Sequence, residues 1–553
     1  MPARRQAQES LPAGQRPPEA RDWLPFLFII AAAFLAYANV YPNEFLLDDE
    51  MDIIQNARLR DWHTLVDAFT SSFTAGAGNR DIFYRPLQTL LYLFIYKAFG
   101  LNTVPFHILN ITLHALNGCL VYALGRRLGF KPLAVVPATL LWLMHPLFVE
   151  SVAYMSGTAD LLYAAFSLFG LLVLFPDFSL RKYMLAAPVY LLAMLGKETG
   201  ILFPLLSFAC QYYAGKHRFE FKNYLKAWPL LLAAGIYFVM RHNALGDNYD
   251  FYKQSNIYTE NILYRLYTFL ATLPEYIRLF VWPDPLYMDR NFPVYTQPLQ
   301  GPVLAGAAIL LVSSACIILA RRRGALPLNW GLMWFAGAHV LHTGVFLPLN
   351  SLFLEHWMYV PAIGFFLGAT QSLALLLEKA SRKITAATIA LAFVAAAALG
   401  ARTWDQNKYW RDPIVFYTHI IESGTVSARA HNNLANAYAE GHQTEKAIEH
   451  LRIAISLSDK FPQTHHNLAL ELLRMPDSEK NIDEAIAELN RAVQLNPEFF
   501  QSYELLANIY AYRGDRAKET ENRTRALALR KHFRVPAEHY AQPRLTSSSG
   551  LIP

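Results

Sequence analysis

The chain contains the run Gly301-Pro-Val-Leu-Ala-Gly-Ala-Ala-Ile-Leu-Leu-Val-Ser-Ser-Ala-Cys-Ile-Ile-Leu-Ala-Arg-Arg-Arg323, in which a long apolar segment ends in three arginines. A helix that crosses a bilayer needs about 20 mostly apolar residues. Lysine and arginine collect in the short loops on the cytoplasmic side of a membrane. The run therefore predicts a transmembrane helix near 303–320 whose C-terminal end faces the cytoplasm.

Composition extends this prediction to the whole chain. Of its 553 residues, 54% are hydrophobic and only 17% are charged, which is too apolar for a soluble protein of this length. The net charge of +6 is spread over short clusters between apolar runs, so we interpret it as a topology signal and an attraction to membrane lipids. No nucleic-acid-binding motif accompanies it. The cysteines lie inside apolar runs without metal-ligand spacing, so no metal site is predicted from them.

The basic clusters define a path across the membrane, because the chain must leave and return between successive cytoplasmic loops. The motif Gly196-Lys-Glu-Thr-Gly200 divides one long apolar run into two helices with Lys197 and Glu198 at the outer tip. This path gives about eleven spans. They lie near 24–41, 104–125, 132–153, 160–176, 183–195, 199–214, 228–241, 303–320, 330–348, 357–377 and 384–401.

After Arg402 the apolar runs shorten and the pattern becomes that of amphipathic helices. The motif His431-Asn-Asn-Leu-Ala-Asn-Ala-Tyr-Ala439 returns as His465-His-Asn-Leu-Ala469 after about 34 residues, the length of a TPR repeat. A third copy begins at Tyr503. About three copies are the minimum that can bury a continuous core. The predicted fold class is therefore all-α, a polytopic membrane bundle followed by a TPR α-solenoid.

The predicted domains follow from these boundaries. Residues 1–22 form a disordered cytoplasmic tail, and 23–402 form the transmembrane domain with large outer loops at 43–103 and 242–302. Within these loops, the apolar stretches 87–99 and 262–282 either lie along the interface or dip into the membrane and return. The TPR domain spans 403–533 on the outer side, and 534–553 is a disordered tail.

Three carboxylates follow the first span, at Asp48, Asp49 and Glu50. Adjacent like charges raise the pKa of one member, which suits a general base that removes a proton from a hydroxyl. The same residues could bind a divalent cation, or could simply begin a helix in solvent. We expect Asp48 and Asp49 to lie in a solvated loop, where loss of either charge is structurally mild.

Other ionisable residues gather at the predicted outer ends of the spans, which favours an interfacial active site over a transport pathway through the membrane. They are His145, Glu150, Asp160, Lys197, Glu198, Glu355 and His356. By contrast, His107, Asn110 and His114 share one face of the second span. For these three we favour interhelical hydrogen bonding over a catalytic role.

Five motifs in order resemble those of the transmembrane and TPR repeat-containing O-mannosyltransferases, and the order of domains matches as well. The motifs are Asp48-Asp49, Tyr84-Arg-Pro-Leu87, His145-Pro-x-x-x-Glu150-x-Val-Ala153 with Ala159-Asp-Leu-Leu162, Lys197-Glu-x-Gly200, and Tyr359-Val-Pro-Ala-Ile-Gly-Phe365. The resemblance covers nearly all of the chain beyond about residue 24. This chain has Thr158 and His356 where that family tends to have arginine.

The resemblance implies a GT-C fold, a mannose donor linked to polyprenyl phosphate, and Ser or Thr hydroxyls of proteins as acceptors. With the position in the outer loop, it assigns Asp48 or Asp49 as the base. Arg85 and Lys197 are outer-face cations that would contact the donor phosphate. The remaining residues, His145, Glu150, Asp160, Glu198, Glu355 and His356, would shape the acceptor side or pair with those groups. No cofactor is predicted, and a divalent cation stays open.

The sequence therefore predicts a membrane glycosyltransferase that moves mannose or another hexose to an acceptor hydroxyl at the outer face. We expect a multi-pass protein of a bacterial inner membrane, with its N-terminus in the cytoplasm and the TPR domain in the periplasm. That domain would bind a protein acceptor or a partner protein. A glycolipid or polysaccharide acceptor is the nearest alternative, followed by a non-enzymatic membrane scaffold. A transporter is disfavoured because no internal repeat pair of spans is visible.

Overall fold

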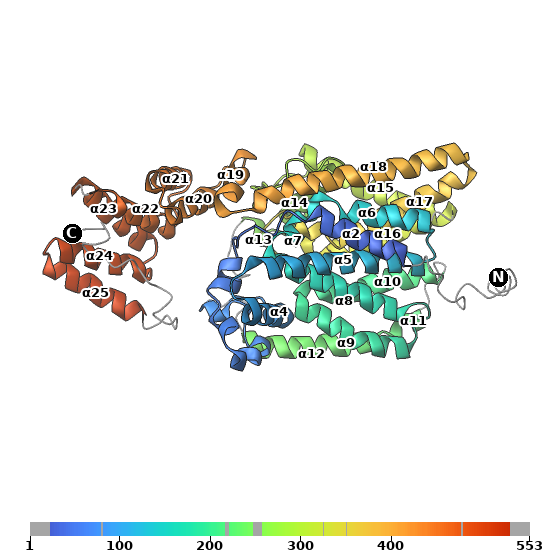
Figure 1. Cartoon of the computed structure of the whole chain (residues 1–553), viewed down its shortest axis with the longest axis horizontal. Coiled ribbons are helices and arrows are strands. Elements are labelled where there is room, and N and C mark those ends of the chain that lie inside the picture. Colours follow the sequence, from blue (N-terminus) through green and yellow to red (C-terminus); the bar gives the residue numbers. More distant parts are fainter. Residues whose placement is uncertain are drawn as a thin grey trace.

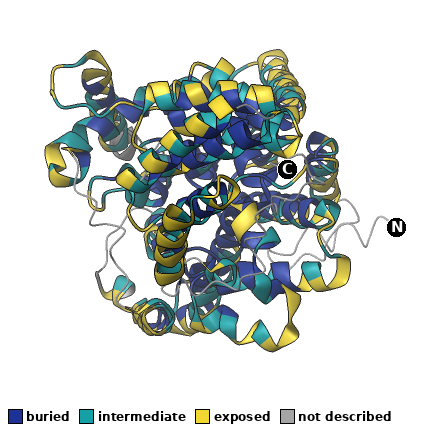
Figure 2. Cartoon of the chain, turned by 90° about the vertical axis from the view of Figure 1, so that its left-hand side faces the viewer, coloured by how far each residue is buried: buried dark blue, intermediate teal, exposed yellow. Residues whose placement is uncertain are grey.

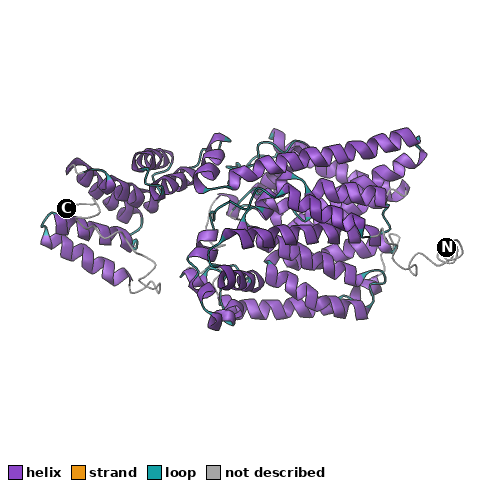
Figure 3. Ribbon diagram, viewed as in Figure 1, coloured by secondary structure: helices purple, strands orange, loops and turns teal. Residues whose placement is uncertain are grey.

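The computed structural model describes residues 23–78, 81–215, 221–246, 257–323, 326–349, 351–476 and 479–530. Within these ranges the regular structure is helical throughout and contains no strand (Figure 3). The predicted all-α class is confirmed. The predicted tail at 1–22 and the predicted tail at 534–553 lie outside the described residues.

A bundle of helices forms the larger part of the molecule, and each of the predicted spans overlaps at least one of them. Their bounds are α2 (Leu24–Ala36), α5 (Thr103–Arg127), α6 (Pro132–Leu143), α7 (Val149–Val152), α8 (Thr158–Leu174), α9 (Leu180–Gly196), α10 (Phe203–Ala214), α12 (Trp228–Leu245), α15 (Gly301–Arg323), α16 (Leu326–His339), α17 (Pro361–Leu376) and α18 (Arg382–Gln406). The predicted break after Gly196 is present, because Lys197 is extended and a short 3-10 helix (Glu198–Leu202) precedes α10.

The helices are apolar on their outer surface. In the part of the chain that is described, five helical segments are long and apolar enough to cross a membrane, or six if α6 and the segment Pro146–Val152, bent by 52°, form one span. In α15 and α18 only 11% of the most apolar window is buried inside the protein. Such surface is stable in lipid and not in water. Figure 2 shows buried and exposed residues alternating along the helices. This is the architecture of a multi-pass membrane protein, and the number of eleven spans stays a prediction.

Helices from the two predicted outer loops form a further group. They are α3 (Asp67–Thr70), α4 (Pro86–Phe99), α13 (Ile257–Glu260) and α14 (Ile262–Val281). The apolar stretches predicted in the outer loops thus form α4 and α14, and neither is among the segments long and apolar enough to span. At the end of the bundle opposite α4 lies α11 (Phe221–Leu225), which belongs to one of the basic loops (Figure 1).

The C-terminal helical domain, residues 413–530, extends from the end of the bundle that carries α4 (Figure 1). It begins with α19 (Pro413–Glu422) and continues with three helix pairs. These are α20 (Ala428–Glu440) with α21 (Thr444–Leu457), α22 (Pro462–Arg474) with α23 (Glu479–Leu495), and α24 (Phe500–Tyr512) with α25 (Arg516–Arg530). Ala435, Leu468 and Leu505 contribute to its own hydrophobic core. The pairs agree with the repeat spacing in the sequence, and their assignment as TPR units stays a prediction.

Polar side chains inside the bundle join helices to one another. His114 on α5 contacts the Tyr359 hydroxyl through Nδ1 at 2.7 Å and the Leu143 carbonyl through Nε2 at 2.9 Å. Asn110, one turn earlier, donates to the Tyr154 carbonyl at 2.9 Å. His107 contacts the Asn43 carbonyl at 3.2 Å. As expected, each of these α5 residues makes a hydrogen bond to another part of the bundle, and Asn110 fixes the turn at Tyr154 against α5.

Candidate active site

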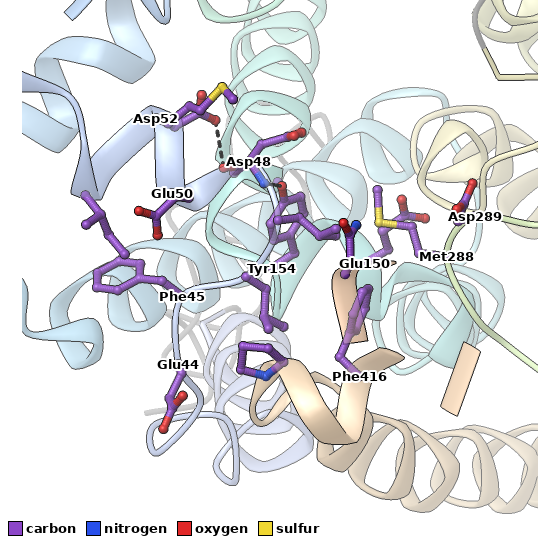
Figure 4. A pocket seen from close by; sticks show the side chains of 18 of the residues that line it. Glu44, Phe45, Asp48, Glu50, Asp52, Glu150, Tyr154, Met288, Asp289 and Phe416 are labelled. Atoms are coloured by element: carbon purple, nitrogen blue, oxygen red, sulfur yellow. Dashed lines mark hydrogen bonds between the residues drawn. The ribbon is translucent and has the colours of Figure 1, made fainter. Parts of the chain in front are cut away.

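A cavity of about 1080 Å³ lies where the bundle meets the C-terminal helical domain. Its walls come from the outer segment 44–55, the start of α4, the segment 150–160, Lys197, the loop before α17, and helices α19 and α20. Figure 4 shows Asp48, Glu50 and Asp52 grouped on one side of this cavity, with Glu150, Met288 and Asp289 on the other. Of the ionisable residues singled out in the sequence, this concave site brings together Asp48, Glu150, Asp160, Lys197 and His356.

Asp48 and Asp49 occupy different positions although they are adjacent. Asp48 lines the cavity and is partly exposed, and the described residues provide no hydrogen-bond partner for its carboxylate. Its backbone N–H donates to the Tyr154 hydroxyl at 2.9 Å, which places the residue at the cavity wall. Of the two carboxylates, Asp48 has the freedom that a base needs.

Asp49 is only 1% exposed and does not line the cavity. Its Oδ2 accepts from the Leu46 N–H at 3.0 Å, and its Oδ1 accepts from the Ser156 N–H at 2.9 Å and the Ser156 hydroxyl at 2.6 Å. Burial raises the pKa of Asp49 to about 7, while these hydrogen bonds favour its charged form. The expectation that both aspartates lie in a solvated loop is wrong for Asp49, because the segment 46–52 folds back onto Ser156.

Two cation–carboxylate pairs line or flank the cavity. Lys197 Nζ lies 2.7 Å from Asp160 Oδ1, and both residues line the cavity. Arg85 Nε lies 3.3 Å from Glu198 Oε2, and its guanidinium stacks over Phe83 at 4.5 Å. Arg85 lines the cavity, whereas Glu198 is behind it. Each cation keeps N–H donors beyond those used by its carboxylate, and these are available to an anionic ligand.

A second group of ion pairs holds the loop before α17. His356 Nδ1 lies 2.7 Å from Glu150 Oε1, and the His356 backbone N–H donates to Glu150 Oε2 at 3.0 Å. Both residues line the cavity. Glu355 turns away from it and contacts Arg290 Nη2 at 2.7 Å. Burial raises the pKa of Glu355 to about 7, and Arg290 opposes this shift.

His145 lies apart from the other predicted site residues. It is buried and does not line the cavity. Its Nδ1 accepts from the Leu147 N–H at 3.2 Å, and its Nε2 contacts the Phe280 carbonyl at 3.2 Å. These contacts shape the bend between α6 and α7, so in this structure His145 supports the backbone that carries Glu150.

The structure adds residues that sequence reasoning missed. Asp52 and Ser156 line the cavity beside Asp48. Asp52 comes four residues after Asp48, so helical spacing on one face was a signal for it. Ser156 offered no such signal, because a serine hydroxyl is common and Ser156 reaches the carboxylates only through folding. Arg290 lies in an outer loop that carries no motif.

One cavity wall belongs to the C-terminal helical domain. Arg429, Asn433, Asn436 and Glu440 of α20 line it from a single face of that helix. Arg429 forms an ion pair with Asp289 in the loop after α14, which joins the two parts of the molecule. Burial, Glu50 and Glu44 all raise the pKa of Glu440, so the mouth of the cavity is acidic. Across the described residues, no group of three or more His, Cys, Asp or Glu side chains is arranged to hold a metal ion.

Comparison with known proteins identifies relatives of one kind. Protein O-mannosyl-transferase F38B6.6 of Caenorhabditis elegans is 24% identical over 452 residues, which cover 79% of this chain and 63% of that protein. Mouse protein O-mannosyl-transferase TMTC3 is 22% identical over 556 residues, covering 92% and 60%. Human TMTC4 is 33% identical over a shorter stretch of 167 residues, 26% of this chain and 22% of that protein. The chain is similar to the protein O-mannosyl-transferases.

The resemblance found in the motifs is thus confirmed by relatives that align over most of this chain. The chain spans about three fifths of the length of the relatives that it matches in this way. No protein-family model matches it. Among solved structures, ArnT from Cupriavidus metallidurans bound to undecaprenyl phosphate gives a TM-score of 0.41 at 14% identity, over 87% of this chain and 81% of that chain.

Proposed function

We propose that this chain is a GT-C-type glycosyltransferase that moves mannose or another hexose from a polyprenyl-phosphate donor to a hydroxyl of a protein. The observation that carries the proposal is the cavity in which the unpaired carboxylate of Asp48 meets the cations Lys197 and Arg85 at one end of an apolar bundle. The relatives named as protein O-mannosyl-transferases support the same reaction class.

The chemistry assigns a role to each group. Asp48 would accept the proton of the acceptor hydroxyl as that oxygen attacks the anomeric carbon of the sugar. The bond from the sugar to the lipid phosphate breaks, and the negative charge that develops on the phosphate needs compensation. Lys197 and Arg85 would supply it, since charge-assisted hydrogen bonds to phosphate are strong in a site that excludes water.

The Glu150–His356 pair would shape the acceptor side of the cavity. His356 uses Nδ1 to contact Glu150, which fixes the plane of the imidazole ring at the cavity wall. Asp160 would orient Lys197, and Glu198 would orient Arg85. Asp49, His145 and Glu355 would hold the backbone segments on which these groups stand.

The C-terminal helical domain would act as a TPR domain and would present the acceptor on the same side as the cavity. The support is the face of α20 that lines the cavity, because an acceptor that enters there must pass Asn433, Asn436 and Glu440. The apolar bundle would lie in a bacterial inner membrane with the basic loops in the cytoplasm and the C-terminal domain in the periplasm. A glycolipid or polysaccharide acceptor is the alternative that the test must separate.

The test uses the full chain reconstituted in lipid vesicles with a polyprenyl-phosphate-linked mannose carrying a radiolabel. Acceptors are a peptide that contains Ser and Thr, the same peptide with Ala at those positions, and a glycolipid extract. Transfer to the first peptide alone supports the proposal. Transfer to the glycolipid alone would show that the acceptor is a glycolipid and not a protein. The reaction would be rejected if no acceptor received more label than it receives from the inactive control Asp48→Asn.

A further inference from the structure

Ser156 contacts two buried carboxyl groups through a single hydroxyl. Its Oγ lies 2.6 Å from Asp49 Oδ1 and 2.8 Å from Asp52 Oδ2, and both aspartates are less than 5% exposed, at 1% and 4%. Both separations are those of hydrogen bonds between oxygen atoms. A serine hydroxyl has one proton, so it can donate to only one of the two carboxyls. The other contact needs a proton that the carboxyl itself supplies.

The surroundings show which carboxyl that is. Asp49 accepts two backbone N–H bonds, from Leu46 and Ser156, in addition to the hydroxyl. Three donors favour an ionised carboxylate. Among the described residues, no N–H group donates to the carboxyl of Asp52, which contacts Ser156 Oγ. A buried carboxyl without N–H donors is more stable with its proton than without it.

The charged neighbours of Asp52 point the same way. Asp48 and Asp49, on its own segment, both disfavour a negative charge on it, and Arg85 from the start of α4 opposes them. Tyr92 on α4 and Tyr154 are also within electrostatic reach. Burial is the largest cause of a pKa for Asp52 that lies well above the usual range, followed by Asp48. Asp52 thus faces two carboxylates and one cation that is already paired with Glu198, and a proton on Asp52 reduces the repulsion.

We propose that Asp52 holds a proton at neutral pH and donates it in a hydrogen bond to Ser156 Oγ, while Ser156 donates to the ionised Asp49. Asp52 is then a positioning residue. The chain Asp52–Ser156–Asp49 ties the outer segment to residues 154–156 and leaves Asp48 at the cavity wall. The protonation stands on hydrogen-bond geometry, burial and neighbouring charge, whereas its effect on catalysis rests on the proposed function.

The proposed proton on Asp52 determines how activity changes with pH. Below the pKa of Asp52 the hydrogen-bonded chain is complete, and above it a third negative charge separates Asp52 from Ser156 and Asp49. Activity should therefore fall on the alkaline side. Asparagine imitates the protonated acid, because its side-chain NH₂ donates where the carboxyl O–H did. Asp52→Asn should thus remove the part of the loss of activity at alkaline pH that is due to Asp52. Leucine has a similar volume but no donor, so Asp52→Leu should not preserve the function of the protonated acid.

The first measurement is independent of activity. Infrared difference spectra of the reconstituted full chain, unaltered minus Asp52→Asn, should contain the carbonyl band of a protonated carboxylic acid at neutral pH. Ser156→Ala should shift this band without removing it. The proposal is overturned if the difference spectrum lacks the band in a variant that is folded by circular dichroism, or if Asp49→Asn removes the band instead.

The second measurement is the pH profile of transfer. Asp52→Asn should stay within about threefold of the unaltered protein at neutral pH, and Asp52→Leu and Ser156→Ala should each lose about tenfold or more. An Asp52→Asn variant as inactive as Asp48→Asn would overturn the positioning role, since Asp52 would then act as a base. If the chain shows no transfer at all, the proposed function fails while the infrared result still decides the protonation.

Discussion

Asp48 and Asp49 are neighbours that the fold places in different surroundings. Asp48 faces the cavity, and Asp49 is buried against Leu46 and Ser156. Loss of charge at Asp48 should leave the fold intact and lower transfer by roughly a hundredfold or more, the usual scale for a lost general base. The measurement compares transfer rates and thermal unfolding of Asp48→Asn with those of the unaltered protein.

Asp49→Asn is the matched variant for that experiment. Asparagine has one acceptor oxygen where aspartate has two, so it cannot accept all three of the hydrogen bonds that Asp49 accepts. A buried donor left without its acceptor destabilises a protein by about 1–3 kcal/mol. We expect Asp49→Asn to lower the unfolding temperature and Asp48→Asn to leave it unchanged. Equal unfolding temperatures would contradict the separate environments of the two carboxylates.

Lys197 carries a second prediction at this scale. Lys197→Met removes the cation proposed for the phosphate and leaves Asp160 buried without its partner at 2.7 Å. Transfer should fall by about 10²–10³-fold, the range for a lost group that stabilises transition-state charge.

The double variant Lys197→Met with Asp160→Asn separates catalysis from folding. It removes both charges of the buried pair, so it should regain stability that the single variant loses. It should not regain transfer, because the cation is still absent. Recovery of transfer in the double variant would show that Lys197 serves only to neutralise Asp160.

At the level of the element, α20 links the two parts of the molecule. Glu440 stands at the cavity mouth near Glu44 and Glu50, where all three add negative charge. Glu440→Lys should raise the KM for a peptide acceptor several-fold and leave hydrolysis of the lipid donor unchanged, since Lys197 and Arg85 lie on other elements. Glu445→Lys on α21 is the control, because it makes the same exchange at an exposed position outside the cavity lining. An equal effect of both variants on the KM would show that α20 has no specific part in acceptor selection.

Elements were predictable from the sequence where the signal is local. Apolar runs and basic clusters found the helices of the bundle, and the repeat spacing found the pairs α20–α25, because each depends on residues close in the chain. The motifs also found Asp48, Lys197 and Glu150. Ser156 and the cavity wall of α20 could not be found in this way. They join the site through contacts between segments more than 100 residues apart, such as Ser156 with Asp49.

At the scale of the whole molecule, the orientation of the chain in the membrane can be tested from its two ends. The C-terminal helical domain and α11 lie at opposite ends of the bundle, and α11 belongs to a basic loop (Figure 1). A reporter that is active only in the periplasm should give signal when fused after Ser427 and none when fused after Arg323. The reverse pattern would place the cavity on the cytoplasmic side and remove the basis for a lipid-linked donor.

The arrangement of the whole molecule makes a final prediction about removing the C-terminal helical domain. The proposed base and cations lie upstream of residue 413, and a chain that ends after Ser427 keeps α19 and loses only the wall that α20 supplies to the cavity. A chain ending after Ser427 should therefore retain slow hydrolysis of the lipid donor and lose most transfer to its native acceptor. Because the truncation also breaks the ion pair between Arg429 and Asp289, the variant Arg429→Ala in the full chain serves as the control. An exposed pair contributes roughly 0–1 kcal/mol, so Arg429→Ala should have little effect. If the correctly inserted truncated chain modifies its native acceptor at the full rate, the domain has no part in selecting the acceptor.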